Sequence, residues 1–237
     1  YDAATITSMN EINLKCKTFN IFFYPDKDLL AYFPLQRLIR VDLQSGKTHA
    51  VEDLKFAPEI LVNNTLIGIS FDESSNKFLA RMDLTTNELS TLIKEPFRLW
   101  GSHALDVYGM KIGKGQEVYS INSKSGCINW CHNFGTDLSG RVLSCSETVV
   151  VIGHSVLFGL DASDGEIVWK NELVNSLTNF NYNKLINVTT SSYREISPET
   201  GEILAEYEMK PEYEKHGFRF MGTNRNFTVT DTHIFIV

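Results

Sequence analysis

Two pairs of neighbouring acidic residues have the composition of a cation site. Asp26 and Asp28 form the first pair, and Asp72 and Glu73 form the second. Carboxylate oxygens are the ligands that Ca²⁺ prefers, and several of them converging from different loops would hold the ion. Solvated turn carboxylates produce the same pattern, and we expect that simpler arrangement. The sequence therefore predicts no metal site.

No catalytic motif stands out. The chain has no nucleophile elbow, no zinc-protease helix motif, no phosphate loop and no dinucleotide fingerprint. The glycine- and lysine-containing stretch at 109–117 has no helix after it, so it lacks the N-terminus that binds phosphate. The six histidines, which show no paired spacing, are His49, His103, His132, His154, His216 and His233. We expect a protein that is not an enzyme and that has no cofactor.

The cysteines favour free thiols over disulfides or zinc. Cys127 and Cys131 lie on one expected strand, where four residues span about 13 Å. A disulfide needs Cα atoms about 4.4 to 6.8 Å apart, so these two cannot bridge in that conformation. With Cys16 and Cys145, the set contains no closely spaced zinc pair. We expect a reducing, cytoplasmic location, and a secreted protein only if a signal peptide preceded residue 1.

Two segments have the composition of a binding surface. The stretch PFRLWGSH at 96–103 is expected to form a loop that connects two repeats. It sets Trp100 beside Arg98 and His103, and aromatic residues next to arginine are frequent in binding hot spots. The longest irregular connection covers 209–222. The residues there that we expect to contact a partner are Glu212, Tyr213, His216 and Arg219. Trp100 could instead fill a groove between repeats, and 209–222 could be a polar linker.

The charge balance limits the kinds of partner. The chain has 22 basic and 29 acidic residues, for a net charge of −7. This field repels nucleic acid and anionic lipid, while it attracts a basic protein. Acidity also keeps a protein soluble. No apolar run reaches the length of a membrane span. We expect a basic protein partner, no nucleic acid, no membrane, and a monomer when the chain is alone.

A repeated hairpin organises the chain. Residues 156–170 read VLFGLDASDGEIVWK and residues 118–132 read VYSINSKSGCINWCH. Both contain an apolar strand, a polar anchor residue, a glycine four residues later, and a second strand that reaches tryptophan. Weaker copies occur at 38–54, 78–93 and 193–209, and successive anchors are 36 to 41 residues apart. This period is typical of propeller blades.

The chemistry of the turn explains the repeat. Asp, Asn or Ser accepts a backbone N–H two residues later, and Gly or Asn then supplies the positive φ that leaves the turn. On both sides, alternating apolar and polar residues favour half-buried antiparallel strands. The expected turns lie near 2–6, 42–46, 83–87, 122–126, 161–165 and 197–201.

The two ends of the chain match the two halves of one hairpin. Residues 232–237 read THIFIV and residues 1–14 read YDAATITSMNEINL; joined, they reproduce the repeat with Asp2 as anchor. Closure of this kind removes an exposed sheet edge. We therefore predict an all-β, six-bladed β-propeller over residues 1–237, one domain of four-stranded antiparallel blades, with the N-terminal strand completing the C-terminal blade. A truncated seven-bladed ring is the alternative.

The repeats resemble the PQQ-like propeller repeat of the quinoprotein dehydrogenases. The match is carried by Leu160-Asp161 through Gly165 to Trp169, and by Ile121-Asn122 through Gly126 to Trp130. In the other copies the tryptophan position holds Ala50, Thr91, Ala205 and Asn10. The resemblance implies that Trp130 and Trp169 pack between blades. It implies no quinone, because the cofactor-binding members are longer and carry adjacent cysteines.

The resemblance and the composition together predict a non-catalytic, protein-binding scaffold. Many relatives without cofactor are interaction scaffolds, and a toxin-neutralising (immunity) protein binding a basic toxin is one concrete form. A calcium-dependent propeller hydrolase or lactonase is the first alternative, and it requires carboxylates from several blades at one point. A sugar-binding lectin is a further alternative, and it requires similar aromatic pockets in successive blades.

Overall fold

The computed structural model describes most of the chain, with gaps. The described residues are 20–23, 28–33, 37–42, 47–51, 54–136, 138–145, 147–153, 156–172, 177–181, 184–188, 192–208, 227–229 and 234–236. All regular elements in these ranges are strands. None of the described residues belongs to a helix long and apolar enough to cross a membrane.

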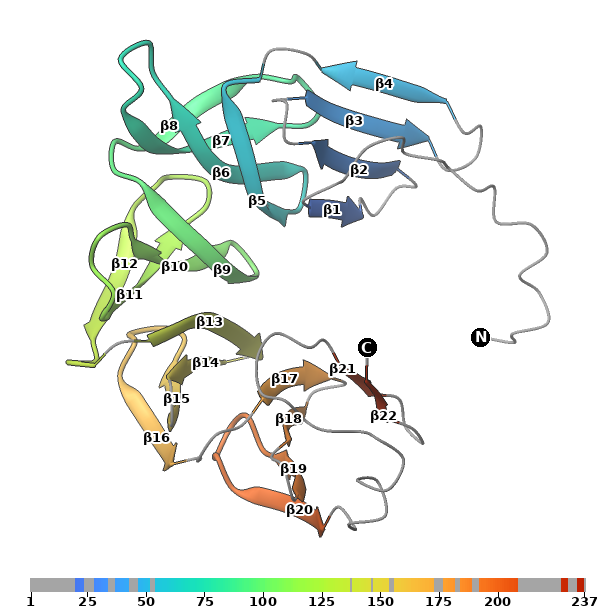
Figure 1. Ribbon diagram of the computed structural model, residues 1–237. Helices are drawn as coiled ribbons and strands as arrows, with labels where there is room; N and C mark the ends of the chain where they lie inside the picture. The colour runs from blue at the N-terminus through green and yellow to red at the C-terminus, as the bar shows by residue number, and fades with distance from the viewer. Residues whose placement is uncertain are drawn as a thin grey trace. The chain divides into compact units, whose positions relative to one another are not determined.

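The described strands form five four-stranded sheets and one two-stranded sheet (Figure 1). The first sheet contains β1 (Asn20–Phe23), β2 (Asp28–Phe33), β3 (Arg37–Asp42) and β4 (Thr48–Val51). The second contains β5 (Phe56–Val62), β6 (Thr65–Phe71), β7 (Lys77–Asp83) and β8 (Leu89–Ile93). The third contains β9 (Phe97–His103), β10 (Asp106–Lys111), β11 (Glu117–Asn122) and β12 (Ile128–Asn133).

The remaining strands follow the same plan. The fourth sheet contains β13 (Leu138–Cys145), β14 (Thr148–Gly153), β15 (Val156–Asp161) and β16 (Ile167–Glu172). The fifth contains β17 (Leu177–Asn181), β18 (Lys184–Val188), β19 (Ser192–Ile196) and β20 (Ile203–Glu208). The short pair consists of β21 (Phe227–Val229) and β22 (Ile234–Ile236). Within every sheet each strand pairs antiparallel with its neighbour in the chain, so the all-β, antiparallel prediction is confirmed.

The chain divides into two compact units. The first comprises Tyr1–Leu99 with Ser123–Gly126, and the second comprises Trp100–Asn122 with Cys127–Val237. The expectation of a single domain over residues 1–237 stays a prediction. Each unit has its own apolar core. In the first unit the core includes Phe56, Leu66 and Met82.

Among its described residues, the second unit has two clusters of buried hydrophobic side chains. One gathers residues of the third and fourth sheets around Val149, Val151 and Trp130. The other gathers residues of the fourth and fifth sheets around Ile152 and Trp169. The middle strands supply most of these residues because side chains on both of their faces are covered; every residue of β14 is buried. A sheet of this kind cannot bury its faces alone, so adjacent sheets must pack.

The repeat builds one turn five times in the described residues. In each copy the anchor amide N–H donates to the carbonyl five residues later. The five bonds, of 2.8 to 3.0 Å, join Asp42 to Lys47, Asp83 to Glu88, Asn122 to Cys127, Asp161 to Glu166, and Ser197 to Glu202. The expected turn at 2–6 and the inner residues of the turn at 42–46 lie outside the described residues.

The anchors and the turn exits behave as the sequence indicates. The Asp161 carboxylate accepts the Ser163 amide N–H at 2.8 Å, and Asp83 accepts the Thr85 amide N–H at 2.7 Å. The exit residue has a positive φ in each described case. The values are 60° at Asn87, 73° at Gly126, 78° at Gly165 and 71° at Gly201. Glycine tolerates this conformation best, which explains its place in the repeat.

A tryptophan on the outer strand of one sheet lies on the turn of the next sheet. The Trp130 indole N–H donates to the Ala162 carbonyl at 2.9 Å. A Cβ atom added at Gly165 would lie 2.5 Å from the Trp130 ring. Glycine is therefore required at position 165 for two reasons. The residue has a positive φ, and the indole occupies the space where a Cβ atom would lie. The expected packing role of Trp130 is confirmed.

The same contact recurs one sheet later. The Trp169 indole N–H donates to the Pro198 carbonyl at 2.9 Å, and a Cβ atom at Gly201 would lie 2.6 Å from the ring. Asn171 adds a bond to the Gly201 carbonyl at 2.9 Å. Trp169 is only 9% exposed. Burying a side chain of this size stabilises the packing by roughly 4–6 kcal/mol before the loss of side-chain entropy.

The structure predicts that Gly165→Ala destabilises the protein far more than Gly135→Ala. Both glycines have positive φ, but nothing lies within 4 Å of a Cβ atom at Gly135. We expect a loss of about 2–4 kcal/mol in the free energy of unfolding for Gly165→Ala and about 1 kcal/mol for Gly135→Ala. Urea unfolding measures both. Equal losses would mean that the indole does not occupy the Gly165 site.

Candidate protein interface

The residues predicted around Trp100 lie on a strand, which corrects the expectation of a loop. Arg98, Trp100 and His103 all belong to β9. The alternation explains the difference: Phe97 and Leu99 are buried, while the Arg98 side chain is exposed. Trp100 is partly buried and packs against the core cluster of the second unit. This placement fits the alternative in which Trp100 fills space between repeats.

The other predicted contact residues cannot be placed. Glu212, Tyr213, His216 and Arg219 lie outside the described residues. Their role in partner binding stays a prediction, as does that of Arg98 and His103, which are exposed residues of β9.

The candidate cation ligands act as turn residues where the structure describes them. The Asp72 carboxylate accepts the amide N–H of Asn76 at 2.8 Å and its side-chain amide at 2.9 Å. These two bonds lower the pKa of Asp72. Asp26 and the side chain of Asp28 lie outside the described residues. No three His, Cys, Asp or Glu side chains gather as metal ligands anywhere in the described part of the chain.

Cys127 and Cys131 form no disulfide, as the sequence predicts. Cys131 lies on β12, whereas Cys127 immediately precedes this strand. Burial raises the pKa of the Cys131 thiol, which disfavours the reactive thiolate.

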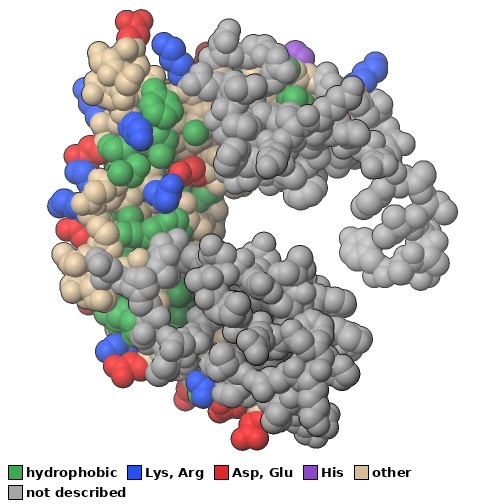
Figure 2. Space-filling view, viewed as in Figure 1, with side chains coloured by type: hydrophobic (Ala, Val, Ile, Leu, Met, Phe, Trp, Pro, Cys, Tyr) green, Lys and Arg blue, Asp and Glu red, His purple; other side chains and the backbone are tan. Residues whose placement is uncertain are grey.

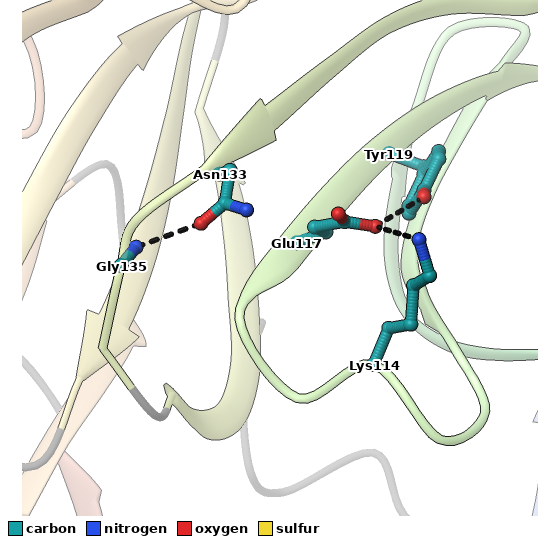
Figure 3. A network of polar contacts seen from close by, with 5 residues as sticks. All are labelled: Lys114, Glu117, Tyr119, Asn133 and Gly135. Carbon is teal, nitrogen blue, oxygen red and sulfur yellow. Dashed lines mark hydrogen bonds and ion pairs between the residues drawn. The ribbon is translucent and has the colours of Figure 1, made fainter.

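A polar network covers the hairpin formed by β10 and β11 (Figure 3). The Tyr119 hydroxyl donates to the Glu117 carboxylate at 2.5 Å, and the Lys114 ammonium lies 3.5 Å from the same oxygen. The Tyr119 bond lowers the pKa of Glu117. Figure 3 also shows the Gly135 amide donating to the Asn133 side chain, at 2.8 Å. These groups stabilise the hairpin and the following turn. The glycines at 109–117 therefore lie in a hairpin, as expected.

Glu59 is a carboxylate that sequence analysis did not single out. It lies on β5 within an apolar segment, and its side chain accepts the Leu99 amide N–H at 2.7 Å. Burial raises the pKa of Glu59, while the Leu99 bond and the Arg98 charge oppose this effect. The carboxylate joins the first strands of two successive sheets. A lone acid in an apolar strand was the only signal for it.

Among the described residues, large exposed apolar side chains are most numerous on the outer strands β16 and β20, and single ones lie on β8 (Leu89) and β12 (Ile128). Each of β16 and β20 is an edge strand of its four-stranded sheet. The two sheets pack through Trp169 and the turn that leads into β20. The residues that define what we name the β16–β20 surface are 41% to 60% exposed; they are Ile167, Val168, Ile203, Leu204 and Tyr207. Sequence analysis missed this surface because apolar residues in a strand normally indicate a core.

The segments that carry these apolar residues are rich in acidic side chains. The segments 163–172 and 199–208 contain seven acidic residues and one lysine. All of these charged side chains are exposed. Figure 2 shows acidic side chains at the lower end of the face in view, where Figure 1 places β20. Lys170 pairs with Glu172 at 3.0 Å and Arg194 pairs with Glu206 at 2.7 Å. The remaining carboxylates give the surface a negative potential.

Repeated four-stranded antiparallel sheets, with tryptophan lying on the turn of the next sheet, define a β-propeller repeat protein. Comparison with solved structures gives a particular relative: the chain is similar to the crystal structure of BamB from Moraxella catarrhalis, with a TM-score of 0.56 and 17% sequence identity. The likeness covers 92% of this chain and 66% of that chain, just under two thirds of its length.

At this identity the likeness shows the fold alone. The resemblance to PQQ-like β-propeller repeat proteins is therefore confirmed at the level of the fold. No protein-family model and no curated protein sequence matches the chain.

We predict that Glu59→Gln changes the pH dependence of stability. A carboxyl whose folded pKa is raised binds more protons when folded, so the free energy of unfolding falls as pH rises from about 4.5 through the folded pKa. Glutamine can still accept the Leu99 N–H but cannot ionise. The variant should therefore gain stability relative to the parent protein as pH rises from about 4 to about 7.

Urea unfolding at both pH values measures this difference. Glu73→Gln, at an exposed carboxylate, corrects for the removal of one negative charge. If Glu59→Gln changes stability by the same amount at both pH values, Glu59 does not bind a proton on folding in this range.

Proposed function

We propose that this chain is a non-catalytic, protein-binding β-propeller whose partner is a basic protein. The observation that carries the proposal is the β16–β20 surface, where five exposed apolar side chains lie among seven carboxylates. Exposed apolar groups that are concentrated on one surface and rimmed by charge are typical of sites of protein contact. Rigid strands hold them in place, so little ordering entropy is lost on binding.

The charge selects the partner. A negative surface accelerates the approach of a basic protein and disfavours an acidic one. It repels nucleic acid and anionic membranes for the same reason. A toxin-neutralising protein that covers a basic toxin in the cytoplasm is one concrete form of this function.

We further propose that the propeller has six blades and that its N-terminal residues complete the last one. Five four-stranded sheets and the pair β21 and β22 account for the described strands. The pair would supply two strands of the sixth blade. Residues 1–14 carry the repeat pattern that follows β22 in the sequence of a blade. Closure would pair the edges that an open arrangement exposes.

The functional proposal predicts that a basic partner binds and that its binding depends on the acidic surface. Affinity capture from the native host, followed by mass spectrometry, should return a stoichiometric basic protein. Its recovery should fall as salt rises from about 0.05 to about 0.5 M, because salt screens charge attraction. The variant Glu202→Lys with Glu208→Lys should lose it.

A control variant with the same change in net charge tests whether the location of the substituted carboxylates matters. Glu73→Lys with Glu88→Lys, at exposed sites in the first unit, changes the net charge equally and should retain the partner. The proposal fails if no stoichiometric partner is recovered, or if both variants lose it equally.

The proposed closure predicts that a circular permutant folds. Val237 is joined directly to Tyr1, and new ends are placed between Gly113 and Lys114, in an exposed hairpin loop. Adjacent ends tolerate such a connection. The permutant should unfold at nearly the same urea concentration as the parent chain. If it folds only when a long flexible linker joins the old ends, closure in this form is contradicted.

A further inference from the structure

We propose that the β16–β20 surface binds a basic segment of the partner through its side chains, with apolar anchors on Val168 and Leu204, and not by the addition of a strand. This inference rests on the proposed function and specifies how the partner is held. Four observations carry it: the repeat position of the residues, the bulges at that position, the surrounding charge, and Tyr207.

The fold does not require the exposed apolar residues at this position. In three outer strands the second residue has no partner on the neighbouring strand, and these residues are Asn129 in β12, Val168 in β16 and Leu204 in β20. Asn129 bonds to Asp106 and Ser120 of its own sheet, at 2.9 and 3.2 Å. The equivalent Val168 and Leu204 are 55% and 56% exposed. A polar residue is compatible with the fold at this position, so folding alone does not explain the exposed aliphatic side chains of Val168 and Leu204.

The bulges decide between two modes of binding. A regular outer strand offers alternating N–H and C=O groups to an added strand. The register shifts between Gly159 and Leu160, and between Glu195 and Ile196, interrupt that pattern in β16 and β20. A bulge twists an edge and protects it from strand pairing. It also directs the unpaired side chain outward. The surface is therefore suited to side-chain contact.

The charge decides which occupant fits. A second copy of this chain would bring seven carboxylates against the same seven, and like charges at an interface disfavour it. A segment with lysine or arginine beside apolar residues satisfies both parts of the surface. Glu166, Glu202 and Glu208 are exposed and available to its cations.

Tyr207 extends the surface along β20. Its ring lies 5.8 Å from the Tyr193 ring, centre to centre, at an interplanar angle of 46°. Tyr193 is buried whereas Tyr207 is 60% exposed. The buried ring supports the exposed one, and a supported tyrosine contributes contact area at little cost in side-chain entropy. An arginine of the partner could pack on its face.

Three synthetic peptides distinguish binding through side chains from the addition of a strand. The first is a capped decapeptide of alternating lysine and leucine. The second replaces each lysine with glutamate. The third carries N-methyl groups on every backbone amide, which blocks both edges against strand pairing but keeps the side chains. Isothermal titration with the intact chain should detect binding of the first, no binding of the second, and binding of the third within about twofold of the first.

Two protein variants locate the site. Val168→Ser with Leu204→Ser should weaken binding of the first peptide at least tenfold, because two apolar contacts are lost. Ile112→Ser, at a residue 46% exposed on the hairpin loop of the same unit, should leave binding unchanged. Urea unfolding should be nearly the same for both variants, since the substituted side chains are exposed.

The outcomes are distinct. Loss of binding on N-methylation would establish strand addition and overturn the proposal. Absence of binding by the first peptide, or equal weakening by Ile112→Ser, would overturn it as well. If Val168→Ser with Leu204→Ser still captures the host partner while the lysine variant at Glu202 and Glu208 loses it, the proposed function stands and this inference fails.

Discussion

The arrangement of the sheets depends on a contact between an indole and a glycine turn. Trp130 and Trp169 each leave the outer strand of one sheet, donate to a carbonyl of the following turn, and lie where a side chain would otherwise begin. The glycine therefore has two functions. It shapes the turn, and it leaves room for the neighbouring sheet. In the second unit this contact packs the third sheet against the fourth and the fourth against the fifth, as neighbouring repeats pack in other repeat proteins.

The turns and the indole contacts are the parts of the fold that could be predicted from the sequence. The anchor residue and the exit glycine act locally, so the turns at 83–87, 122–126, 161–165 and 197–201 follow from a few residues each. The indole contacts follow from the resemblance to a known repeat. In the first unit, where Thr91 replaces tryptophan, the Leu92 carbonyl lies against Gly126 instead. The turn is thus retained with a different contact.

The proposed binding surface was harder to predict, for physical reasons. Consecutive apolar residues begin β16 and β20 and indicate buried strands, but Val168 and Leu204 are unpaired at a bulge and exposed. Glu59 gave no motif because its partner, the Leu99 amide, is forty residues away. The stretch at 96–103 was expected to form a loop between repeats, but Phe97 and Leu99 alternate as a strand. These are tertiary effects that local patterns do not encode.

The indole and the turn glycine should be energetically coupled if the account of the fold is right. A double-mutant cycle with Trp130→Ala and Gly165→Ala, followed by urea unfolding, measures this coupling. We predict a coupling free energy of about 1–3 kcal/mol, because the added methyl group no longer meets the ring once the indole is removed. Additive losses from the two substitutions would contradict the account.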